Sequence, residues 1–307
     1  MTHRYRTALP YVALALMPLF YSSNLIIGRA AIAETSPVTL AFFRWLLATA
    51  MVLPLAMGAT RQTWFVLRGA WRTILLLGFL GMVMCGAGVY VSLQWTTATN
   101  ATLIYTTSPA LIVLIEWLFA GRAVNRIQLL GLATACLGIA TIVLRGELQR
   151  LLALDFNLGD IGIAVAALSW ALYSVILRRE GLGNVPVLSS FAAISVAGTL
   201  CLFPFFLLEL ATTADIPTTK SAWLSIAALA LIPSVLAFSF FQYGVQAVGA
   251  SKAGAFLYAL PLYGVFLAVI FLGEAFEAYH VAGLILVTGG IAMATLPTPR
   301  KRTKPPI

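Results

Sequence analysis

Residues 71–144 read WRTILLLGFLGMVMCGAGVYVSLQWTTATNATLIYTTSPALIVLIEWLFAGRAVNRIQLLGLATACLGIATIVL, and a shift of 152 residues lays them without a gap on residues 223–296. The matched pairs include Trp71 and Trp223, Gln94 and Gln246, Ala101 and Ala253, Pro109 and Pro261, and Gly138 and Gly290. Chance matching of apolar sequence does not explain paired glycines, prolines and amides. The chain therefore contains an internal repeat, and the fold follows from that repeat.

Composition identifies an integral membrane protein. Hydrophobic residues make up 61% of the 307 residues, charged residues make up 9%, and the mean hydropathy is +0.97, whereas a soluble domain is roughly 25% charged. The net charge of +9 does not indicate a nucleic-acid partner, because the basic residues lie between apolar spans, as orientation signals do. Cys85, Cys136 and Cys201 lie inside apolar spans, so they predict neither a disulfide nor a metal site.

Ten apolar spans of about 20 residues, the length that a bilayer core requires, follow one another along the chain. They cover 10–33, 37–58, 73–95, 98–121, 126–145, 159–178, 186–209, 222–247, 251–273 and 277–296. The first span is too long for a signal-peptide core and lacks an Ala-x-Ala exit, so we expect it to be retained. The expected division is an N-terminal tail 1–9, a first repeat 10–145, an outer linker 146–157, a second repeat 158–297 and a basic tail 298–307.

Lysine and arginine residues indicate how the chain is oriented, since cytoplasmic loops collect them. Of the 19 such residues, fourteen fall on the side that holds both termini, four fall on the opposite side, and Arg44 lies inside a span. We therefore expect both termini in the cytoplasm, with the protein in the cell inner (plasma) membrane.

Five spans per repeat is an odd number, so the second copy must enter the membrane upside down. Charge agrees with this inversion: the hairpin 121–126 is basic, whereas its counterpart 273–278 is acidic. We therefore expect an all-α monomer of ten transmembrane helices, arranged as two inverted five-helix repeats around a central cavity. Repeats of this kind are typical of secondary transporters, which open the cavity to alternate sides by rocking one half against the other.

The chain resembles the EamA-type branch of the drug/metabolite transporter superfamily over residues 10–296. The resemblance is carried by Tyr21-Ser22-Ser23-Asn24, by Pro37 and Arg44, and by two Pro-containing helices, Ser108-Pro109 to Gly121 and Leu260-Pro261 to Gly273-Glu274. The chain departs from the family pattern in two places, because Tyr21-Ser22 stands where many members have Trp-Gly and Arg122 stands where the first repeat often has a glutamate. The resemblance implies export of small metabolites through a cavity lined by helices 1, 3, 4, 6, 8 and 9. Among the family, the chain is similar to YddG-type exporters of aromatic and other amino acids.

Candidate substrate-binding residues are the amide and the polar-tipped aromatic side chains inside the spans. They are Tyr21, Asn24, Tyr90, Trp95, Tyr105, Trp170, Tyr173, Tyr243, Tyr258 and Tyr263. Flat apolar walls with a few hydroxyl and indole donors suit a small amphipathic solute. An interface belt remains an alternative for Trp95, and core packing remains one for each residue taken singly. The polar and aromatic clusters of the first and sixth helices are expected to face each other.

Pro109 and Pro261, one in each repeat, are candidate hinges. Each proline frees the carbonyl four residues earlier, which belongs to Tyr105 in the first copy and to Leu257 in the second. Such a carbonyl needs a partner in lipid. Its partner is either a nearby serine or threonine or a ligand.

Three polar residues inside the spans also suit a structural role, including the candidate Asn24. Asn24 either joins helices by hydrogen bonds or faces the cavity. Arg44 either binds a substrate carboxylate or, as intramembrane charges usually pair, anchors to carbonyls at a helix end. Glu116 lies within reach of Arg122 or Arg126 and is interpreted as structural.

An enzyme is not expected, because the chain has only His3 and His280 as histidines and shows no metal cluster or phosphate-binding loop. A channel would show charged rings or a filter loop. We expect a transporter that exports small, partly apolar metabolites. Amino acids, including aromatic ones, are the expected substrates. Nucleobases, sugars and amphipathic drugs remain alternative substrates, and both facilitated movement and proton exchange remain open. The expected partners are a small-molecule substrate and the lipid bilayer, with no cofactor.

Overall fold

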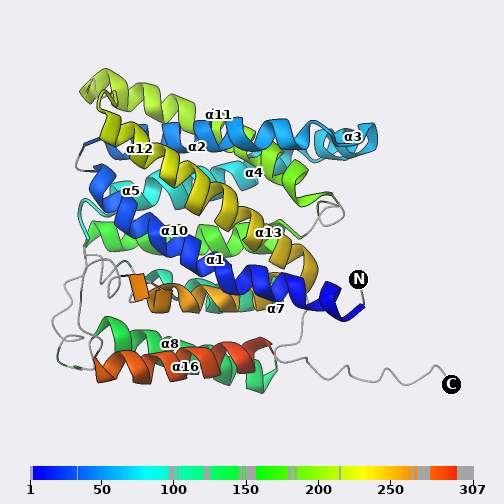
Figure 1. The fold of residues 1–307 in the computed structure, drawn as a ribbon, viewed down its shortest axis with the longest axis vertical. Helices are drawn as coiled ribbons and strands as arrows, with labels where there is room; N and C mark the ends of the chain where they lie inside the picture. The colour runs from blue at the N-terminus through cyan, green and yellow to red at the C-terminus, as the bar shows by residue number, and fades with distance from the viewer. Residues whose placement is uncertain are drawn as a thin grey trace.

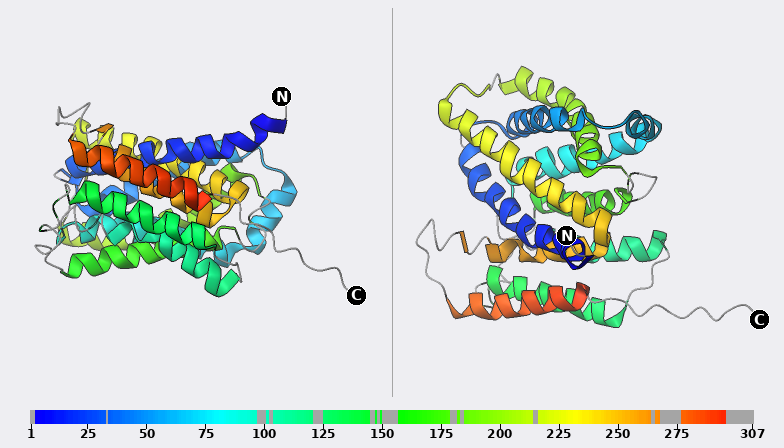
Figure 2. Two further views of the ribbon diagram at one scale, coloured as in Figure 1. Left: turned by 90° about the horizontal axis from the view of Figure 1, so that it is seen from below. Right: turned by 45° about the vertical axis from the view of Figure 1, so that its right-hand side comes forward.

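The computed structural model describes residues 3–32, 34–96, 101, 104–120, 125–144, 147, 149, 157–178, 182, 185–213, 216–263, 266–267 and 277–295. These residues form helices and short turns, with no strand among them. In chain order the elements are α1 His3–Ile32, α2 Pro37–Ala56, α3 Arg61–Gly69, α4 Trp71–Gly78, η1 Phe79–Ala87, α5 Gly88–Ser92, α7 Ser108–Ala120, α8 Arg126–Val143, α10 Leu158–Ile176, α11 Val187–Thr213, α12 Lys220–Leu229, η3 Ala230–Leu236, α13 Ala237–Val248, α14 Ala250–Ala255, η4 Phe256–Ala259 and α16 Ala278–Thr295. The long helices run side by side across the molecule (Figure 1, Figure 2).

Seven helical segments of the described chain are long and apolar enough to cross a membrane. They are 37–56, 71–92, 126–143, 158–176, 187–213, 220–248 and 278–295, and each falls on a predicted span. α1 is longer still, with 30 residues, which corresponds to about 45 Å of helix. The expectation of an all-helical, multi-pass membrane protein is therefore confirmed.

The sequence predicted one helix for each of the two proline-containing spans. The structure interrupts both helices near the proline. In the first repeat Thr106 and Thr107 form a turn, and α7 begins at Ser108 with Pro109 as its second residue. Proline is tolerated there because the first helical N–H groups have no intrahelical partner. In the second repeat α14 tightens into the 3₁₀ turn η4 before the helix resumes at Leu260. The basic and acidic hairpins 121–126 and 273–278 lie largely outside the described residues, as does the basic tail 298–307.

Helices that correspond in the two repeats pack against each other. α2 packs on α11 and α8 on α16, and both pairs are equivalent under the 152-residue shift, while α7 of the fourth expected span packs on α14 of the ninth. Other contacts between the halves are crossed: α1 packs along α12, η3 and α13, while α10 packs along α7, η1 and α5. The core of the molecule therefore lies between helices of the two halves.

Glycines allow α8 and α16, the lowest pair in Figure 1, to approach backbone to backbone. A Cβ built on Gly131 of α8 would lie 2.7 Å from Gly290 O of α16, and one built on Gly283 would lie 3.0 Å from Gly138 O. Only residues without a side chain permit such an approach. The order of the contacts, 131 with 290 and 138 with 283, makes the helices antiparallel.

The third helix of each repeat contains a π-helical segment. η1 covers residues 79–87 and η3 covers residues 230–236, so a shift of 152 lays the start of η1 on η3. π-Helical turns occur most often at functional sites. Here each segment faces the middle of the bundle, since η1 packs on α10 and η3 packs on α1.

The N-terminus of α2 is closed by an acidic residue of its partner helix α11. Glu209 accepts hydrogen bonds from the backbone N–H of Val38 at 3.2 Å and of Thr39 at 2.6 Å, and from Ser36 Oγ at 2.9 Å. These first N–H groups have no partner within α2, and a carboxylate also suits the positive end of the helix dipole. The contact fixes α2 against α11.

Candidate functional site

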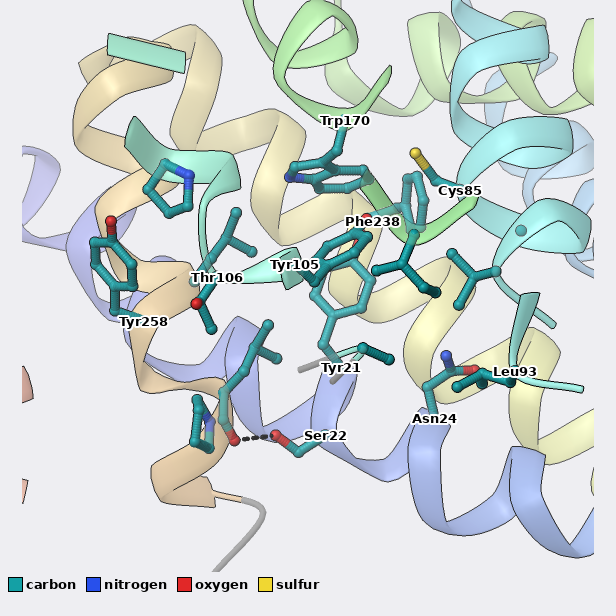
Figure 3. Close-up of a pocket in the computed structure, with 18 of the residues that line it drawn as sticks. Tyr21, Ser22, Asn24, Cys85, Leu93, Tyr105, Thr106, Trp170, Phe238 and Tyr258 are labelled. Atoms are coloured by element: carbon teal, nitrogen blue, oxygen red, sulfur yellow. Dashed lines mark hydrogen bonds between the residues drawn. The ribbon is translucent and has the colours of Figure 1, made fainter. Parts of the chain in front are cut away.

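A cavity of about 330 Å³ lies in the middle of the bundle. Its lining comes from α1, α2, η1, α5, α7, α10, α13 and η4, together with the turns around both prolines. These elements include every helix that the family resemblance implied, and they add α2. Figure 3 shows Tyr258 and Asn24 at opposite sides of the site, with Tyr21 between them.

Three aromatic rings from three helices form one wall of the cavity. The Trp170 ring of α10 meets the Tyr21 ring of α1 edge to face at 5.8 Å between centroids, and it meets the Phe238 ring of α13 in the same way at 5.3 Å. Tyr21 and Phe238 also touch, at 5.5 Å. Edge-to-face contacts are the favoured geometry for aromatic pairs, so this wall is held in place without a ligand.

Several hydrogen-bond donors of the cavity residues have no partner. Tyr21 OH, Trp45 Nε1 and Trp170 Nε1 are buried and make no hydrogen bond within the described part of the chain. A buried donor without a partner is unfavourable, and more so in lipid, where no water replaces the bond.

A hydrogen-bonded cluster around Arg44 forms the polar end of the cavity. Arg44 is only 4% exposed. It donates through Nη1 to Asn24 Oδ1 at 2.8 Å and to Tyr90 OH at 2.6 Å, and through Nε to Ser234 Oγ at 2.6 Å. Tyr90 OH in turn donates to Asn24 Oδ1 at 2.7 Å. The cluster joins α1, α2, α5 and η3 through side chains, and not through the helix-end carbonyls that the sequence had favoured as partners of Arg44.

Half of the predicted substrate-binding residues line the cavity: Tyr21, Asn24, Tyr105, Trp170 and Tyr258. Both predicted hinge residues, Pro109 and Pro261, line it as well. Tyr90 lies just behind the lining, where it bonds to Asn24 and Arg44. Polar and aromatic residues in the middle of a span tend to face the protein interior, and this tendency is what made these positions predictable.

The other four predicted residues are not part of the lining. Trp95 is 61% exposed and follows the end of α5. Tyr173 is fully buried behind Trp170, where it stacks at 5.4 Å and accepts a hydrogen bond from Gln242 Nε2. Tyr263 donates to the carbonyl of Ala15 in α1. Tyr243 is half-buried and outside the lining.

Sequence reasoning missed Trp45, Cys85 and Phe238 as cavity residues. In a sequence this apolar, nothing distinguishes an apolar side chain that lines a cavity from one that packs in the core. The shift of 152 places Phe238 on Gly86, and both line the cavity, but neither position was predicted from the sequence.

The carbonyls next to the prolines are already occupied. Tyr105 O accepts from Ser108 Oγ at 2.6 Å, and Leu257 O accepts from the N–H of Leu260. In the first repeat, the partner of the carbonyl freed by the proline is therefore a nearby serine, which was one of the two alternatives. A third carbonyl, Leu260 O, lies 2.8 Å from Ser22 Oγ, which ties α1 to the residue before Pro261.

Glu116 of α7 is buried and accepts a hydrogen bond from Ser251 Oγ of α14. This contact links the two proline-containing spans away from the cavity lining. The structural interpretation of Glu116 agrees with that position.

The EamA-like transporter family matches residues 8–144 and 157–296. The chain belongs to the EamA-like transporter family. The two matched regions correspond to the two expected repeats, and the resemblance seen in the sequence is confirmed. As a member of this family the chain is a membrane transporter.

Among the curated relatives of this EamA-like transporter, the uncharacterized transporter YyaM of Bacillus subtilis is 24% identical over 96% of both chains. The aromatic amino acid exporter YddG of Ancylobacter novellus is 27% identical, covering 67% of this chain and 70% of its own. A probable terminal-alkyne amino-acid exporter of Streptantibioticus cattleyicolor is 25% identical, covering 69% and 71%. A solved crystal structure superposes with a TM-score of 0.76 at 21% identity, over 95% of this chain and 97% of that one, and it shows the fold.

Proposed function

We propose that this transporter exports amino acids, including aromatic and apolar ones, by alternating access. The observation that carries the proposal is the division of the cavity into an aromatic wall, made by Tyr21, Trp170 and Phe238, and a polar end at Asn24 and Arg44. A volume of about 330 Å³ falls within the range of pockets that bind small molecules. An amphipathic solute rests its apolar side chain on the rings while its charged end reaches the polar cluster.

The architecture that we propose is a monomer of ten transmembrane helices in two inverted repeats, with both termini in the cytoplasm. The antiparallel contact of α8 and α16 supports the inversion, because Gly131 pairs with Gly290 and Gly138 with Gly283, and the 152-residue shift exchanges these two pairs. The equivalent π-helical segments η1 and η3 support it as well. Inverted repeats place a shared site between them, which agrees with a cavity lined from both halves.

The names of two relatives support the choice of amino acids over other metabolites. One is an aromatic amino acid exporter and the other a probable exporter of terminal-alkyne amino acids. In this chain the three rings at the cavity offer the corresponding surface for an aromatic or large apolar side chain.

Flux in proteoliposomes tests this function. The purified chain is reconstituted, and efflux of labelled phenylalanine, tryptophan, leucine and alanine is compared with efflux of uracil, glucose and an amphipathic drug. Empty liposomes of the same lipid serve as the control. Saturable efflux of the amino acids is expected. Saturable efflux of uracil, glucose or the drug with none of any amino acid would replace the proposed substrate class.

A further inference from the structure

The guanidinium of Arg44 is fully bonded on one side and free on the other. Nε donates to Ser234 Oγ, and Nη1 donates to both Asn24 Oδ1 and Tyr90 OH. These bonds use every proton on Nε and Nη1. Nη2 makes no hydrogen bond with any described residue, yet it is not sealed from solvent. Arg44 is a lining residue of the cavity, and the two N–H groups of Nη2 are the guanidinium donors that the described residues leave unused.

Asn24 supplies a second pair of free donors. Its side-chain oxygen accepts from Arg44 Nη1 and from Tyr90 OH. An arginine only donates, so the amide atom that faces Nη1 must be the oxygen and the NH₂ group must point elsewhere. Nδ2 makes no hydrogen bond within the described chain and is not sealed from solvent. Asn24 also lines the cavity, so the polar end presents free donors and a positive charge.

No acidic residue among those described balances the charge of Arg44. The cavity lining contains no aspartate or glutamate, and the three bonded partners of Arg44 are neutral. A charge inside a membrane protein is costly and normally pairs with an opposite one. Ser234 Oγ accepts from Arg44 Nε and donates its own proton to Leu229 O at 2.8 Å, so this hydroxyl stays neutral and does not offset the charge of Arg44.

We propose that the solute is recognised through a carboxylate that binds Arg44 Nη2 and Asn24 Nδ2. This inference rests on the proposed function for the passage of the solute, and it names the chemical group that the cavity selects. A carboxylate has acceptors only, and its charge-assisted bonds with an arginine are about twice as strong as neutral ones. The bound anion supplies the negative charge that no described residue provides beside Arg44.

The same charge pattern gives the amino group of an amino acid a minor role. The lining has a cation for a carboxylate but, among the described residues, no anion for an ammonium. A carboxylic acid without an amino group therefore binds about as well as the amino acid. An amine without a carboxylate binds poorly, because its ammonium would lie beside Arg44 with no opposite charge.

Binding of three matched probes to the purified full chain tests this inference: phenylalanine, phenylpropionate, which lacks the amino group, and phenethylamine, which lacks the carboxylate. Affinities are measured by isothermal titration calorimetry and checked by thermal shift. The two acids are expected to bind at least about tenfold more tightly than the amine. Equal or tighter binding of phenethylamine overturns the inference, and so does a failure of both acids to bind.

Two variants connect the carboxylate to Arg44. Arg44→Gln is expected to weaken phenylpropionate binding about ten- to a hundredfold, while Arg68→Gln, at an exposed arginine of α3, leaves it unchanged. Asn24→Asp provides Arg44 with an internal carboxylate, so it is expected to abolish phenylpropionate binding even if Arg44→Gln does not fold. Parent affinity in Arg44→Gln or in Asn24→Asp overturns the inference.

Two further arms separate the possible explanations. Chloride at the same donors is tested as a probe of its own, and stabilisation by chloride with none by phenylpropionate overturns the carboxylate assignment. Amino-acid efflux is measured on the same preparations. Carboxylate binding without amino-acid efflux overturns the proposed function and supports this inference. Efflux at the parent rate in Arg44→Gln overturns this inference and supports the proposed function.

Discussion

The indole ring of Trp170 on α10 meets the phenol ring of Tyr21 on α1 edge to face, with centroids 5.8 Å apart and planes at 89°. α1 and α10 are the first helices of the two repeats, and their aromatic clusters were expected to face each other. The contact places both rings on one wall of the cavity, beside Phe238 of α13. Any side chain that a solute presents to this wall meets surfaces from both halves of the molecule.

Trp170→Ala is expected to reduce efflux of aromatic and large apolar amino acids roughly several-fold and to spare small ones. A contact with an aromatic ring is worth on the order of 1 kcal/mol beyond the burial of area. Efflux of phenylalanine and alanine from proteoliposomes measures the difference. Trp95→Ala is the matched control, because that tryptophan is 61% exposed and outside the cavity. An equal loss for both amino acids would assign Trp170 to packing.

Asn24→Ala is expected to reduce efflux of all amino acids alike. The change removes the oxygen that accepts from both Arg44 and Tyr90, and with it the position of the polar end, whereas the aromatic wall remains. The measurement is the same amino-acid panel at matched protein levels. Unchanged efflux, or a loss restricted to aromatic amino acids, would contradict this role.

Pro109→Ala and Pro261→Ala are expected to slow transport more than they lower expression. Both prolines line the cavity at breaks in their helices, and an alanine there would favour a continuous helix that moves less readily. Efflux per molecule of purified protein is the measurement. Pro54→Ala, at an exposed proline inside α2, is the control. If both cavity variants transport at the parent rate, the prolines are kinks and not hinges.

Gly290→Ala is expected to lower thermal stability, whereas Gly289→Ala is expected to have little effect. A Cβ at Gly290 would lie 2.5 Å from Ala135 N and 2.6 Å from Gly131 O, while a Cβ at Gly289 would meet nothing within 4 Å. Forcing an extra carbon into a packed contact costs about 1–3 kcal/mol. Thermal unfolding in detergent, followed by size-exclusion chromatography, compares the two variants. Equal melting temperatures would show that the contact of α8 with α16 adapts easily.

Cysteines placed at His3 and at Thr303 are expected to resist an impermeant thiol reagent added outside intact cells. The background lacks Cys85, Cys136 and Cys201. The expectation rests on the fourteen-to-four distribution of lysine and arginine in the sequence, since Thr303 lies outside the described residues. Labelling after the cells are opened is the control for reactivity. Ready labelling of either position in intact cells would reverse the proposed topology.

The amino-acid sequence alone determined the class, the repeat and the family. These are properties of the linear chain: hydropathy counts residues, and the 152-residue shift compares positions without reference to space. The sequence also predicted Tyr21, Asn24 and Trp170 at the cavity, because a polar or amphipathic residue in the middle of a membrane span is driven toward the protein interior.

Only the tertiary structure decided which faces of the helices meet. The π-helical segments change the rotation of all residues that follow them, so a 3.6-residue period does not continue through η1 or η3. Trp95 and Tyr243 both follow such a segment and lie outside the lining, while Phe238, which also follows one, lies within it. The bonds of Arg44 were equally hidden, since Asn24, Tyr90 and Ser234 reach it from three other elements. Such a cluster exists only when distant parts of the chain pack together, and no local pattern in the sequence records which of them will touch.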